Sequence, residues 1–223
     1  MNTRTQRIDW GQLCRVRPIC YEFGLNRGLP IDRYYVENFL GRWASDVRGR
    51  VLEIGDDSYT RQFGQEQVTQ ADVLHVSEGN PGATFVGDLT DAPHLPADAF
   101  DCFILTQTLH LIEDVRAALR TIYRILKPSG VLLATFPGIS QISCDQWAET
   151  WRWSFTVASA RRLFAEVFPP LQTEIKAYGN VLATTAYLQG LAVAELTPSE
   201  LDVHDPRYEM LITVRAVKPD NHP

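Results

Sequence analysis

Residues 101–138 constrain the fold most, because they predict a strand, a helix and a second strand in fewer than forty residues. The apolar run 103–105 is too short for a helix and indicates a buried parallel strand. From Val115 to Leu126, apolar side chains recur at three- and four-residue steps, which predicts a helix with one face against a sheet. Arg116, Arg120 and Arg124 should then face water. A Lys-Pro-Ser-Gly turn ends this helix before a second strand over 131–136.

The two strands and the helix between them form a βαβ unit, whose crossover is right-handed in nearly every known case. In a sheet built from such units, ligands lie at the carboxyl ends of the strands. Gln107, Thr108 and His110 follow the first strand, and Pro137 and Gly138 follow the second. The sequence therefore predicts a ligand site near these residues.

Composition and charge limit the classes of protein that this chain could be. With 223 residues, 45% of them hydrophobic and 22% charged, the chain is long enough for one good core and short for two domains. A formal charge of −6 disfavours a nucleic-acid binder, which needs clustered Lys and Arg to displace counterions from phosphates. We therefore expect one domain with additions and no nucleic-acid partner.

The cysteines and the apolar segments favour a cytoplasmic protein. The four cysteines are scattered, with no CxxC pair and no His at ligand spacing, so neither a zinc site nor a disulfide framework is indicated. We expect no metal. The first ten residues lack the apolar core of a signal peptide, and no stretch approaches the length of a membrane span. The cysteines are Cys14, Cys20, Cys102 and Cys144.

Over residues 50–138 the chain resembles class I S-adenosylmethionine-dependent methyltransferases, specifically the small-molecule "type 11" group. The shared features are an acidic residue before a strand, a polar residue at its end, a Leu-His pair, and a Leu-Lys-Pro-x-Gly turn into a Leu-rich strand. The resemblance implies a doubly wound α/β fold, a Rossmann-like sheet of seven strands whose last strand, over 211–217, is antiparallel. Residues 1–45 would form an N-terminal extension and a helix over the pocket, and residues 46–223 the catalytic domain with a lid at about 139–158.

The first strand and its turn, residues 50–58, correspond to the segment on which relatives bind the cofactor. Glu53 and Gly55 match the family pattern, whereas Asp57 stands where relatives usually have a second glycine. Asp57 would repel the pyrophosphate of a dinucleotide, which disfavours a nicotinamide cofactor. S-adenosylmethionine carries a cationic sulfur and amino group, which Glu53 and Asp57 could attract.

Three further segments match places where relatives contact the cofactor. Relatives place an acid at the end of the second strand, expected here over 72–76, to hold the ribose hydroxyls. Ser77 and Glu78 are the candidates for that role, with a solvent-exposed loop as the alternative. Asp88, after a third strand over 84–89, matches the acid that accepts from the adenine amino group, and Leu89 would pack on the ring. Gln107 is the polar residue that ends the fourth strand.

Candidate acceptor-binding residues lie in the N-terminal helix, which begins at 31–32, and in the lid. Arg27, Arg33 and Tyr34 could contact a cofactor carboxylate or an acceptor, although surface ion pairs and core packing would explain them as well. The lid residues Trp147 and Trp151 could stack against a planar or sugar-like acceptor, or belong to the core.

The histidine after the fourth strand is the candidate catalytic residue. His110 lies where acceptors approach in this fold, and an imidazole with a near-neutral pKa suits a general base that deprotonates a hydroxyl or an amine. In many relatives a His at this place serves mainly to shape the pocket, and that alternative stays open.

The resemblance implies methyl transfer from S-adenosylmethionine to an oxygen or nitrogen atom of a small molecule, such as a sugar or a secondary-metabolite intermediate. The methyl group is already activated, so the protein mainly aligns the reactants and excludes water. The alternative is a methyltransferase-fold protein that binds a partner or catalyses another reaction, as the departures at Asp57 and Ser77 suggest. A nucleic-acid methyltransferase is disfavoured, because residues 106–109 lack the Asn/Asp-Pro-Pro-aromatic signature.

Overall fold

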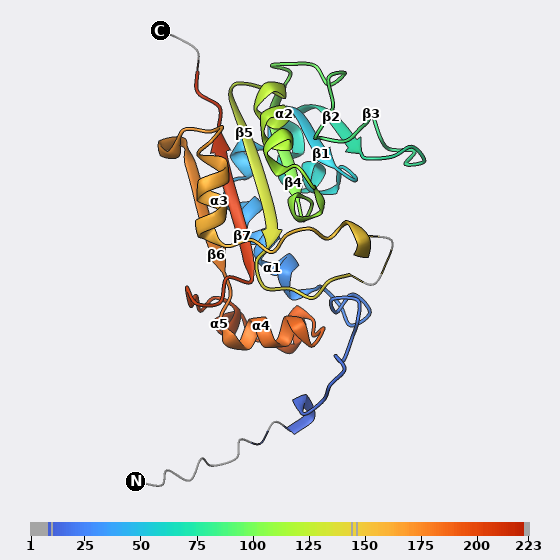
Figure 1. The fold of residues 1–223 in the computed structure, drawn as a ribbon, viewed down its shortest axis with the longest axis vertical. Helices are drawn as coiled ribbons and strands as arrows, with labels where there is room; N and C mark the ends of the chain where they lie inside the picture. The colour runs from blue at the N-terminus through green and yellow to red at the C-terminus, as the bar shows by residue number, and fades with distance from the viewer. Residues whose placement is uncertain (1–8, 10, 144, 146, 221–223) are drawn as a thin grey trace.

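The computed structural model describes residue 9, residues 11–143, residue 145 and residues 147–220. They form a seven-stranded sheet in the order β3-β2-β1-β4-β5-β7-β6 (Figure 1). The strands are β1 (Gly49–Ile54), β2 (Val68–His75), β3 (Phe85–Val86), β4 (Phe100–Thr106), β5 (Leu126–Pro137), β6 (Thr173–Tyr178) and β7 (Leu211–Val217). The pairs from β3 to β5 are parallel, whereas β7 is antiparallel to both β5 and β6. The predicted doubly wound α/β sheet with an antiparallel last strand is confirmed.

Helices cover both faces of this sheet. The α-helices are α1 (Ile31–Arg42), α2 (Val115–Ile125), α3 (Val157–Phe164), α4 (Val181–Leu188) and α5 (Pro198–Leu201). Single turns of other helix types are η1 (Gly11–Leu13), η2 (Ala44–Asp46), η3 (Thr60–Gly64), η4 (Gln65–Gln67), η5 (Leu109–Leu111), η6 (Ala148–Thr150), η7 (Pro170–Gln172) and η8 (Val193–Glu195). Figure 1 shows α2 and α3 on one face of the sheet and α1 on the other.

The alternation of side chains along β4 divides the core into two clusters. Phe103 and Leu105 pack against α2 and α3, whereas Cys102 and Ile104 pack against α1 and α4. All four side chains are buried. Successive residues of a strand point to opposite faces, so a continuous apolar run is what a strand covered on both sides requires.

Polar side chains cap the starts of α2, α3 and α5. Asp114 accepts a hydrogen bond from the Ala117 N–H at 2.9 Å at the start of α2. The Thr156 hydroxyl accepts from the Ser159 N–H at 3.1 Å before α3. The Thr-Pro-Ser-Glu spacing at 197–200 predicts a capping box, and there the Glu200 carboxylate accepts from the Thr197 N–H at 2.7 Å, with Pro198 in the first turn of α5. Such caps satisfy N–H groups that have no partner within the helix.

Two predicted elements are shorter in the structure. The third strand is only Phe85–Val86, because Asp88 accepts from the Thr90 and Asp91 N–H groups and turns the chain away from the sheet. The mostly small and apolar residues over 179–196 predict one helix, whereas α4 ends at Leu188. Its C-terminal glycine, Gly190, has a φ of +71° and lies against the Cys20 carbonyl, which leaves no room for a Cβ.

The arginine face predicted for α2 is also only partly correct. Arg116 and Arg120 are exposed, but Arg124 is half-buried and donates to the Leu95 carbonyl at 2.6 Å and the Ala92 carbonyl at 2.7 Å. The loop before β4 therefore folds over this end of α2 and uses the guanidinium group to satisfy its carbonyls.

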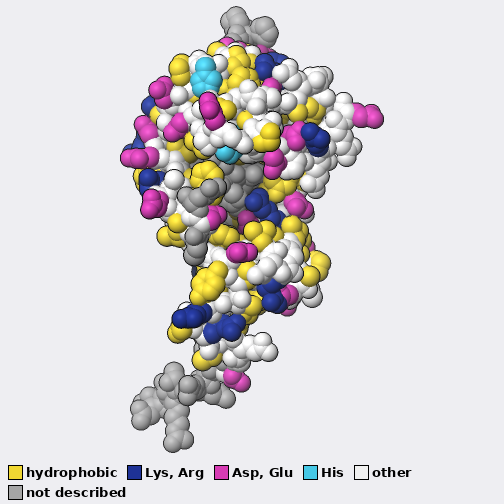
Figure 2. Space-filling model, turned by 90° about the vertical axis from the view of Figure 1, so that its right-hand side faces the viewer, with side chains coloured by type: hydrophobic (Ala, Val, Ile, Leu, Met, Phe, Trp, Pro, Cys, Tyr) yellow, Lys and Arg dark blue, Asp and Glu magenta, His cyan; other side chains and the backbone are white. Residues whose placement is uncertain are grey.

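Residues 11–30 and the residues that follow β7, up to 220, lie at opposite ends of the molecule (Figure 1). The N-terminal segment, the loop after β5 and α4 lie together at the end of the sheet to which the β5 arrowhead points. Figure 2 shows acidic side chains spread over the wider part of the molecule and several Lys and Arg side chains on its narrower part. Among the described residues, no helix is long and apolar enough to cross a membrane.

Candidate functional site

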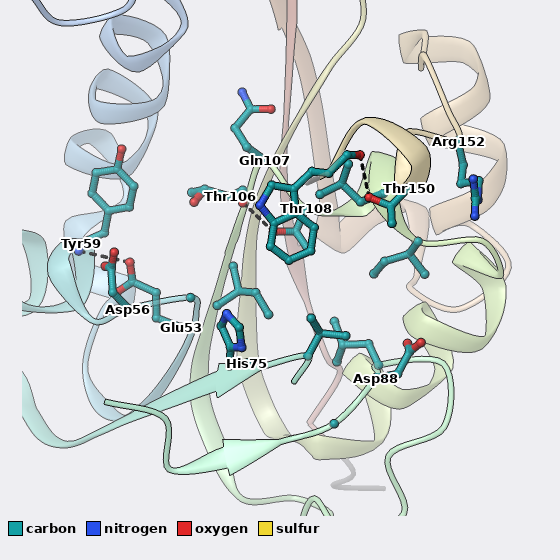
Figure 3. A pocket seen from close by; sticks show the side chains of 18 of the residues that line it. Glu53, Asp56, Tyr59, His75, Asp88, Thr106, Gln107, Thr108, Thr150 and Arg152 are labelled. Atoms are coloured by element: carbon teal, nitrogen blue, oxygen red, sulfur yellow. Dashed lines mark hydrogen bonds between the residues drawn. The ribbon is translucent and has the colours of Figure 1, made fainter. Parts of the chain in front are cut away.

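A cleft of about 620 Å³ lies at the carboxyl ends of β1, β2 and β4 (Figure 3). The strand order reverses between β1 and β4, and ligands of doubly wound sheets bind at such a reversal. Figure 3 shows Glu53, Asp56 and Tyr59 on one side of the cleft, and Thr150 and Arg152 on another. The remaining lining residues are Arg33, Ile54, Gly55, Ser58, His75, Val76, Gly87, Asp88, Leu89, Thr106, Gln107, Thr108, Leu111, Ile112, Glu113 and Trp147.

The carboxylate of Glu53 holds the turn after β1 in place. It accepts from the Tyr59 N–H at 3.2 Å, and from the N–H and hydroxyl of Thr60 at 2.7 Å each. The side chain is only 2% exposed, and burial raises the pKa of Glu53 to about 7, against the effect of these hydrogen bonds. Glu53 therefore lines the cleft and also caps the turn that begins at Thr60.

Gly55 has a backbone conformation that other residues rarely adopt. Its φ is +86°, and a Cβ placed there would meet no protein atom within 4 Å. The Gly55 N–H donates to the Leu74 carbonyl at 2.9 Å, and the Gly55 carbonyl accepts from the Asn80 side chain at 2.6 Å. The backbone of this turn is therefore fixed on both sides, while open space faces it from the cleft.

The structure does not bring Asp57 to the cleft. Its carboxylate accepts from the Arg61 guanidinium at 2.7 Å, one helical turn further along, and it lines a separate hollow beside β2. The preceding residue lies in the cleft instead, where the Asp56 carboxylate accepts from the Ser58 N–H at 2.8 Å. The acidic side chain at this turn that faces the cleft is thus Asp56, which the sequence analysis did not single out.

The end of β2 carries His75 rather than an acid. The strand ends one residue before the predicted limit, and its register sets Leu74 beside Ile54, so the next residue, His75, lines the cleft, whereas Ser77 and Glu78 do not. His75 Nδ1 lies 2.7 Å from the Ser77 carbonyl and 3.4 Å from the Ser77 N–H. Because a carbonyl oxygen only accepts, the shorter contact favours the tautomer with the proton on Nδ1 and an acceptor at Nε2.

Asp88 and Leu89 lie in the cleft, as the sequence analysis expects of cofactor-binding residues. The Asp88 carboxylate accepts from the Thr90 N–H at 2.8 Å, which fixes its side chain at the start of the loop. Leu89 is 3% exposed and packs into the core beneath the cleft. The roles of both residues in cofactor binding stay predictions.

Gln107 joins the cleft to a second, smaller cavity. It has a φ of +46°, and its backbone N–H donates to the Thr135 carbonyl at 2.8 Å. Its side-chain amide donates to Asp32 Oδ2 at 3.3 Å. A non-glycine residue in this backbone region is strained, and such strain is concentrated at functional sites.

The second cavity, of about 220 Å³, lies beside the cleft and shares four of its lining residues. Of the predicted acceptor residues, Arg33, Trp147 and Trp151 line it, and so does His110. Tyr34 does not, because its hydroxyl donates to Asp202 at 2.7 Å, and Arg27 pairs with Glu195. The shared residues are Arg33, Gln107, Leu111 and Trp147.

His110 lies behind the ring of Trp151, with 4.3 Å between ring centroids. It is 3% exposed, and burial lowers its pKa to about 4. Its Nδ1 has no hydrogen-bond partner among the residues that the structure describes. At neutral pH the imidazole is therefore uncharged and a weak base, which favours a role in shaping the cavity over one in catalysis.

No group of three or more His, Cys, Asp or Glu side chains within the described part of the chain is placed to hold a metal ion. Cys14, Cys20 and Cys102 have free thiols, and Cys144 lies outside the described residues. The chemistry of the site is therefore to be sought in the cleft, in the smaller cavity and in the side chains that they share.

Residues 42–134 match the family model described as "Methyltransferase domain". A stretch of 77 residues, 33% of the chain, is 30% identical to the probable polyketide synthase 5 of Dictyostelium discoideum. This chain spans only 3% of the length of that curated relative. The match therefore concerns a short part of a much longer protein.

Similar solved structures support the fold over most of the chain. The N-methyltransferase NodS of Bradyrhizobium japonicum, in complex with S-adenosylhomocysteine, is 15% identical with a TM-score of 0.56, over 86% of this chain and 90% of that one. A Mesorhizobium loti S-adenosylmethionine-dependent methyltransferase is 19% identical with a TM-score of 0.53, over 84% and 98%. The [4+2]-cyclase SpnF is 20% identical with a TM-score of 0.55, over 84% and 82%.

The family match covers the strands β1 to β4 and most of β5, and hence the strand ends that form the cleft. The sheet order, the antiparallel last strand and the position of the cleft agree with this match. Residues 42–134 therefore match a methyltransferase domain, and the fold of the described chain is similar to that of solved S-adenosylmethionine-dependent methyltransferases.

Proposed function

We propose that this protein methylates an oxygen or nitrogen atom of a small molecule, such as a sugar or a secondary-metabolite intermediate, in the cytoplasm. The observation that carries the proposal is the pair of adjoining cavities, about 620 Å³ at the strand ends and about 220 Å³ beside it. A methyltransferase needs a donor site and an acceptor site that meet, so that the two reacting atoms are aligned and water is excluded.

The side chains of the larger cleft fit a cationic cofactor. Four carboxylates but only two guanidinium groups line this cleft. The walls therefore favour a ligand that carries positive charge. The open space over Gly55 leaves room for a ligand against the backbone. S-adenosylmethionine supplies a methyl group already activated on a sulfonium when it is bound. The carboxylates are Glu53, Asp56, Asp88 and Glu113, and the guanidinium groups are those of Arg33 and Arg152.

Three side chains of this cleft would hold the cofactor's nucleoside. His75 Nε2, an acceptor in the tautomer that the Ser77 contact favours, would accept from a ribose hydroxyl in place of the family's acid. Asp88 would accept from the adenine amino group, and Leu89 would pack on the ring. The turn at Gly55 and the Arg33 guanidinium would then face the amino-acid part of the cofactor.

The acceptor would occupy the smaller cavity, under the lid that we propose for residues 139–158. Trp147 lines both cavities, and Trp151 walls the smaller one. The Trp153 indole N–H donates to the Ile112 carbonyl at 2.8 Å, and the Arg152 N–H donates to the His110 carbonyl at 2.9 Å. These contacts tie the lid to the loop after β4 and would exclude water from the reacting atoms.

A second candidate function is another reaction in the same pocket. The specific observation is that His75 stands where relatives have an acid, and that Asp57 replaces a glycine and points away from the cleft. The [4+2]-cyclase SpnF has a similar fold, and this similarity supports a reaction other than methyl transfer as the second candidate.

The test measures S-adenosylhomocysteine formed from S-adenosylmethionine in the presence of a panel of hydroxylated and amino small molecules. Methyl transfer predicts turnover with at least one acceptor, and loss of turnover in Gly55→Val. The matched control is Gly79→Val, which carries a similar positive φ of +106° but lies outside the cleft. Cofactor binding without turnover on any acceptor would favour the second candidate.

A further inference from the structure

Asp32, in the first turn of α1, presents a buried carboxylate to the smaller cavity. The residue is 7% exposed and lines this cavity together with Gln107 and His110. Its Oδ2 accepts from the Gln107 amide at 3.3 Å, whereas Oδ1 has no hydrogen-bond partner among the residues that the structure describes. One acceptor atom of a carboxylate is therefore left for a ligand.

No salt bridge within the described residues neutralises Asp32. The neighbouring Arg33 donates instead to the Tyr59 hydroxyl at 3.2 Å. A buried carboxylate that lacks a full set of partners costs several kcal/mol. Buried ionisable groups of this kind are concentrated at functional sites. The backbone N–H groups at the start of α1 offset part of this cost, but Oδ1 is left without a partner among the described residues.

The walls of this cavity are aromatic. The Phe23 and Trp151 rings are nearly parallel, at 7° between planes and 6.5 Å between centroids, and the Tyr187 ring lies 6.0 Å from that of Phe23. The volume of about 220 Å³ is below the ~300–1,000 Å³ typical of cavities that enclose drug-sized ligands, so it has room for about one ring. A ring that stacks on aromatic faces and carries a hydrogen-bond donor fits these walls.

We infer that Asp32 Oδ1 binds a hydroxyl group of a ring-shaped acceptor, either a sugar or a phenol, and takes up its proton as the oxygen is methylated. The inference rests on the proposed methyl transfer. In the balanced step an oxygen–methyl bond forms, the methyl–sulfur bond breaks with its electron pair left on sulfur, and the hydroxyl proton moves to Oδ1. No further reactant is needed.

The groups around Asp32 favour a neutral hydroxyl over a charged amine. The Arg33 guanidinium is already close enough to act on the Asp32 charge, and a second cation would be repelled by it. The other polar groups that line the cavity are the uncharged Gln107 amide, the His110 imidazole and the Ser143 and Tyr187 hydroxyls. These groups could hydrogen-bond the remaining hydroxyls of a sugar ring.

The experiment measures saturation-transfer NMR signals of single-ring probes on the full chain, with S-adenosylhomocysteine bound. The probes are methyl β-glucopyranoside and para-cresol, each beside its O-methylated counterpart, so that a sugar and a phenol are distinguished. The variants are Asp32→Asn, which keeps the shape of the side chain, and Asp91→Asn, a matched change at an exposed position outside both cavities. Calorimetry of S-adenosylhomocysteine and thermal unfolding accompany each variant.

We expect one hydroxylated probe to bind the wild type and Asp91→Asn, and its methylated counterpart to bind about tenfold more weakly or not at all. In Asp32→Asn that probe should lose about tenfold in affinity, while S-adenosylhomocysteine binds unchanged. The melting temperature of Asp32→Asn should equal or exceed that of the wild type, because the variant removes an unpaired buried charge.

Four results would overturn the inference: no hydroxylated probe binds, the methylated counterparts bind equally well, Asp32→Asn binds the probe like the wild type, or Asp32→Asn also loses S-adenosylhomocysteine. The last result would assign Asp32 to the cofactor site. Failure of the wild type itself to bind S-adenosylhomocysteine would instead reject the proposed methyl transfer, so the two failures are distinguishable.

Discussion

Glu53 and His110 are buried ionisable residues whose pKa values are shifted in opposite directions by the same cause. Burial disfavours the charged form of each, so the pKa of the carboxyl rises to about 7 and that of the imidazole falls to about 4. Both side chains are therefore largely uncharged near pH 6. Their effects on stability are predicted to run in opposite directions: the Glu53 contribution is lost as the pH rises, and the His110 contribution is lost as the pH falls.

For Glu53 the raised pKa means that its protonated form stabilises the folded state. That contribution is complete below about pH 4.5 and is lost as the pH rises to about 7. Relative to Glu53→Gln, the wild type should therefore lose about 3 kcal/mol of unfolding free energy between pH 4.5 and pH 8. Urea unfolding of both proteins at several pH values measures this difference, and parallel profiles would refute the prediction.

For His110 the lowered pKa means that the neutral imidazole stabilises the folded state. That contribution is complete above about pH 6.5 and is lost as the pH falls to about 4. Relative to His110→Phe, which can still pack on Trp151, the wild type should lose about 3 kcal/mol over this range. An imidazole that titrates near pH 6.5 by NMR would contradict the burial described above.

The end of the second strand shows what sequence reasoning missed at this scale. An acid was sought after Val76, whereas His75 is the residue that the strand end presents to the cleft. The end of this strand was predicted one residue too late. Because successive side chains of a strand point to opposite faces, an error of one residue selects the wrong side chain. In the structure Val73 pairs with Glu53 and Leu74 with Ile54, a register that the apolar run of β2 does not specify by itself.

Turns and caps make testable claims at the scale of the element. The turn after β1 depends on Gly55, whose φ of +86° disfavours any side chain. Gly55→Ala and Gly79→Ala should each cost about 1–2 kcal/mol of stability, because both place a Cβ at a positive φ without a steric clash. Only Gly55→Ala should also weaken S-adenosylhomocysteine binding, as measured by calorimetry. Equal affinities in the two variants would show that the cofactor does not approach this turn.

Asn180 holds the start of α4 and ties it to the loop after α5. Its side chain accepts from the Ala183 N–H at 2.9 Å and donates to the Glu200 and Val203 carbonyls at 2.7 and 2.8 Å. Asn180→Ala should cost about 2–3 kcal/mol, because it removes the cap and leaves two carbonyls short of a partner. Thr156→Ala, at an exposed cap, should cost about 1 kcal/mol. Equal losses in chemical unfolding would contradict this ranking.

Elements with a strong periodic pattern were predicted well, whereas those set by contacts far along the chain were not. The helix α2 follows from its spacing of apolar residues alone, and the structure gives it the bounds Val115–Ile125. The end of α4 depends on residues 19–20, which donate to the Gln189 carbonyl from the far N-terminal segment. No local pattern reports such a contact. The same holds for Asp32, whose place in the smaller cavity depends on Gln107, 75 positions away.

For the whole molecule, the order of the sheet decides where a ligand binds. The reversal between β1 and β4 places the cleft, and α1 brings Arg33 to it and Asp32 to the smaller cavity beside it. The family resemblance was sufficient to predict the sheet and the main cleft. The smaller cavity was not predicted, because most of its walls come from the N-terminal segment, α1, the lid and α4, which lie outside the matched residues 42–134.

Titration calorimetry of the wild type with S-adenosylhomocysteine, repeated on Asp88→Ala and Gly55→Val, tests the central claim most directly. The account predicts binding in the micromolar range, about −8 kcal/mol at a dissociation constant of ~1 μM, and a loss of about tenfold or more in both variants. Thermal unfolding of the variants confirms that they remain folded. Absence of binding to the wild type, or full affinity in both variants, would contradict a methyl-donor site in this cleft.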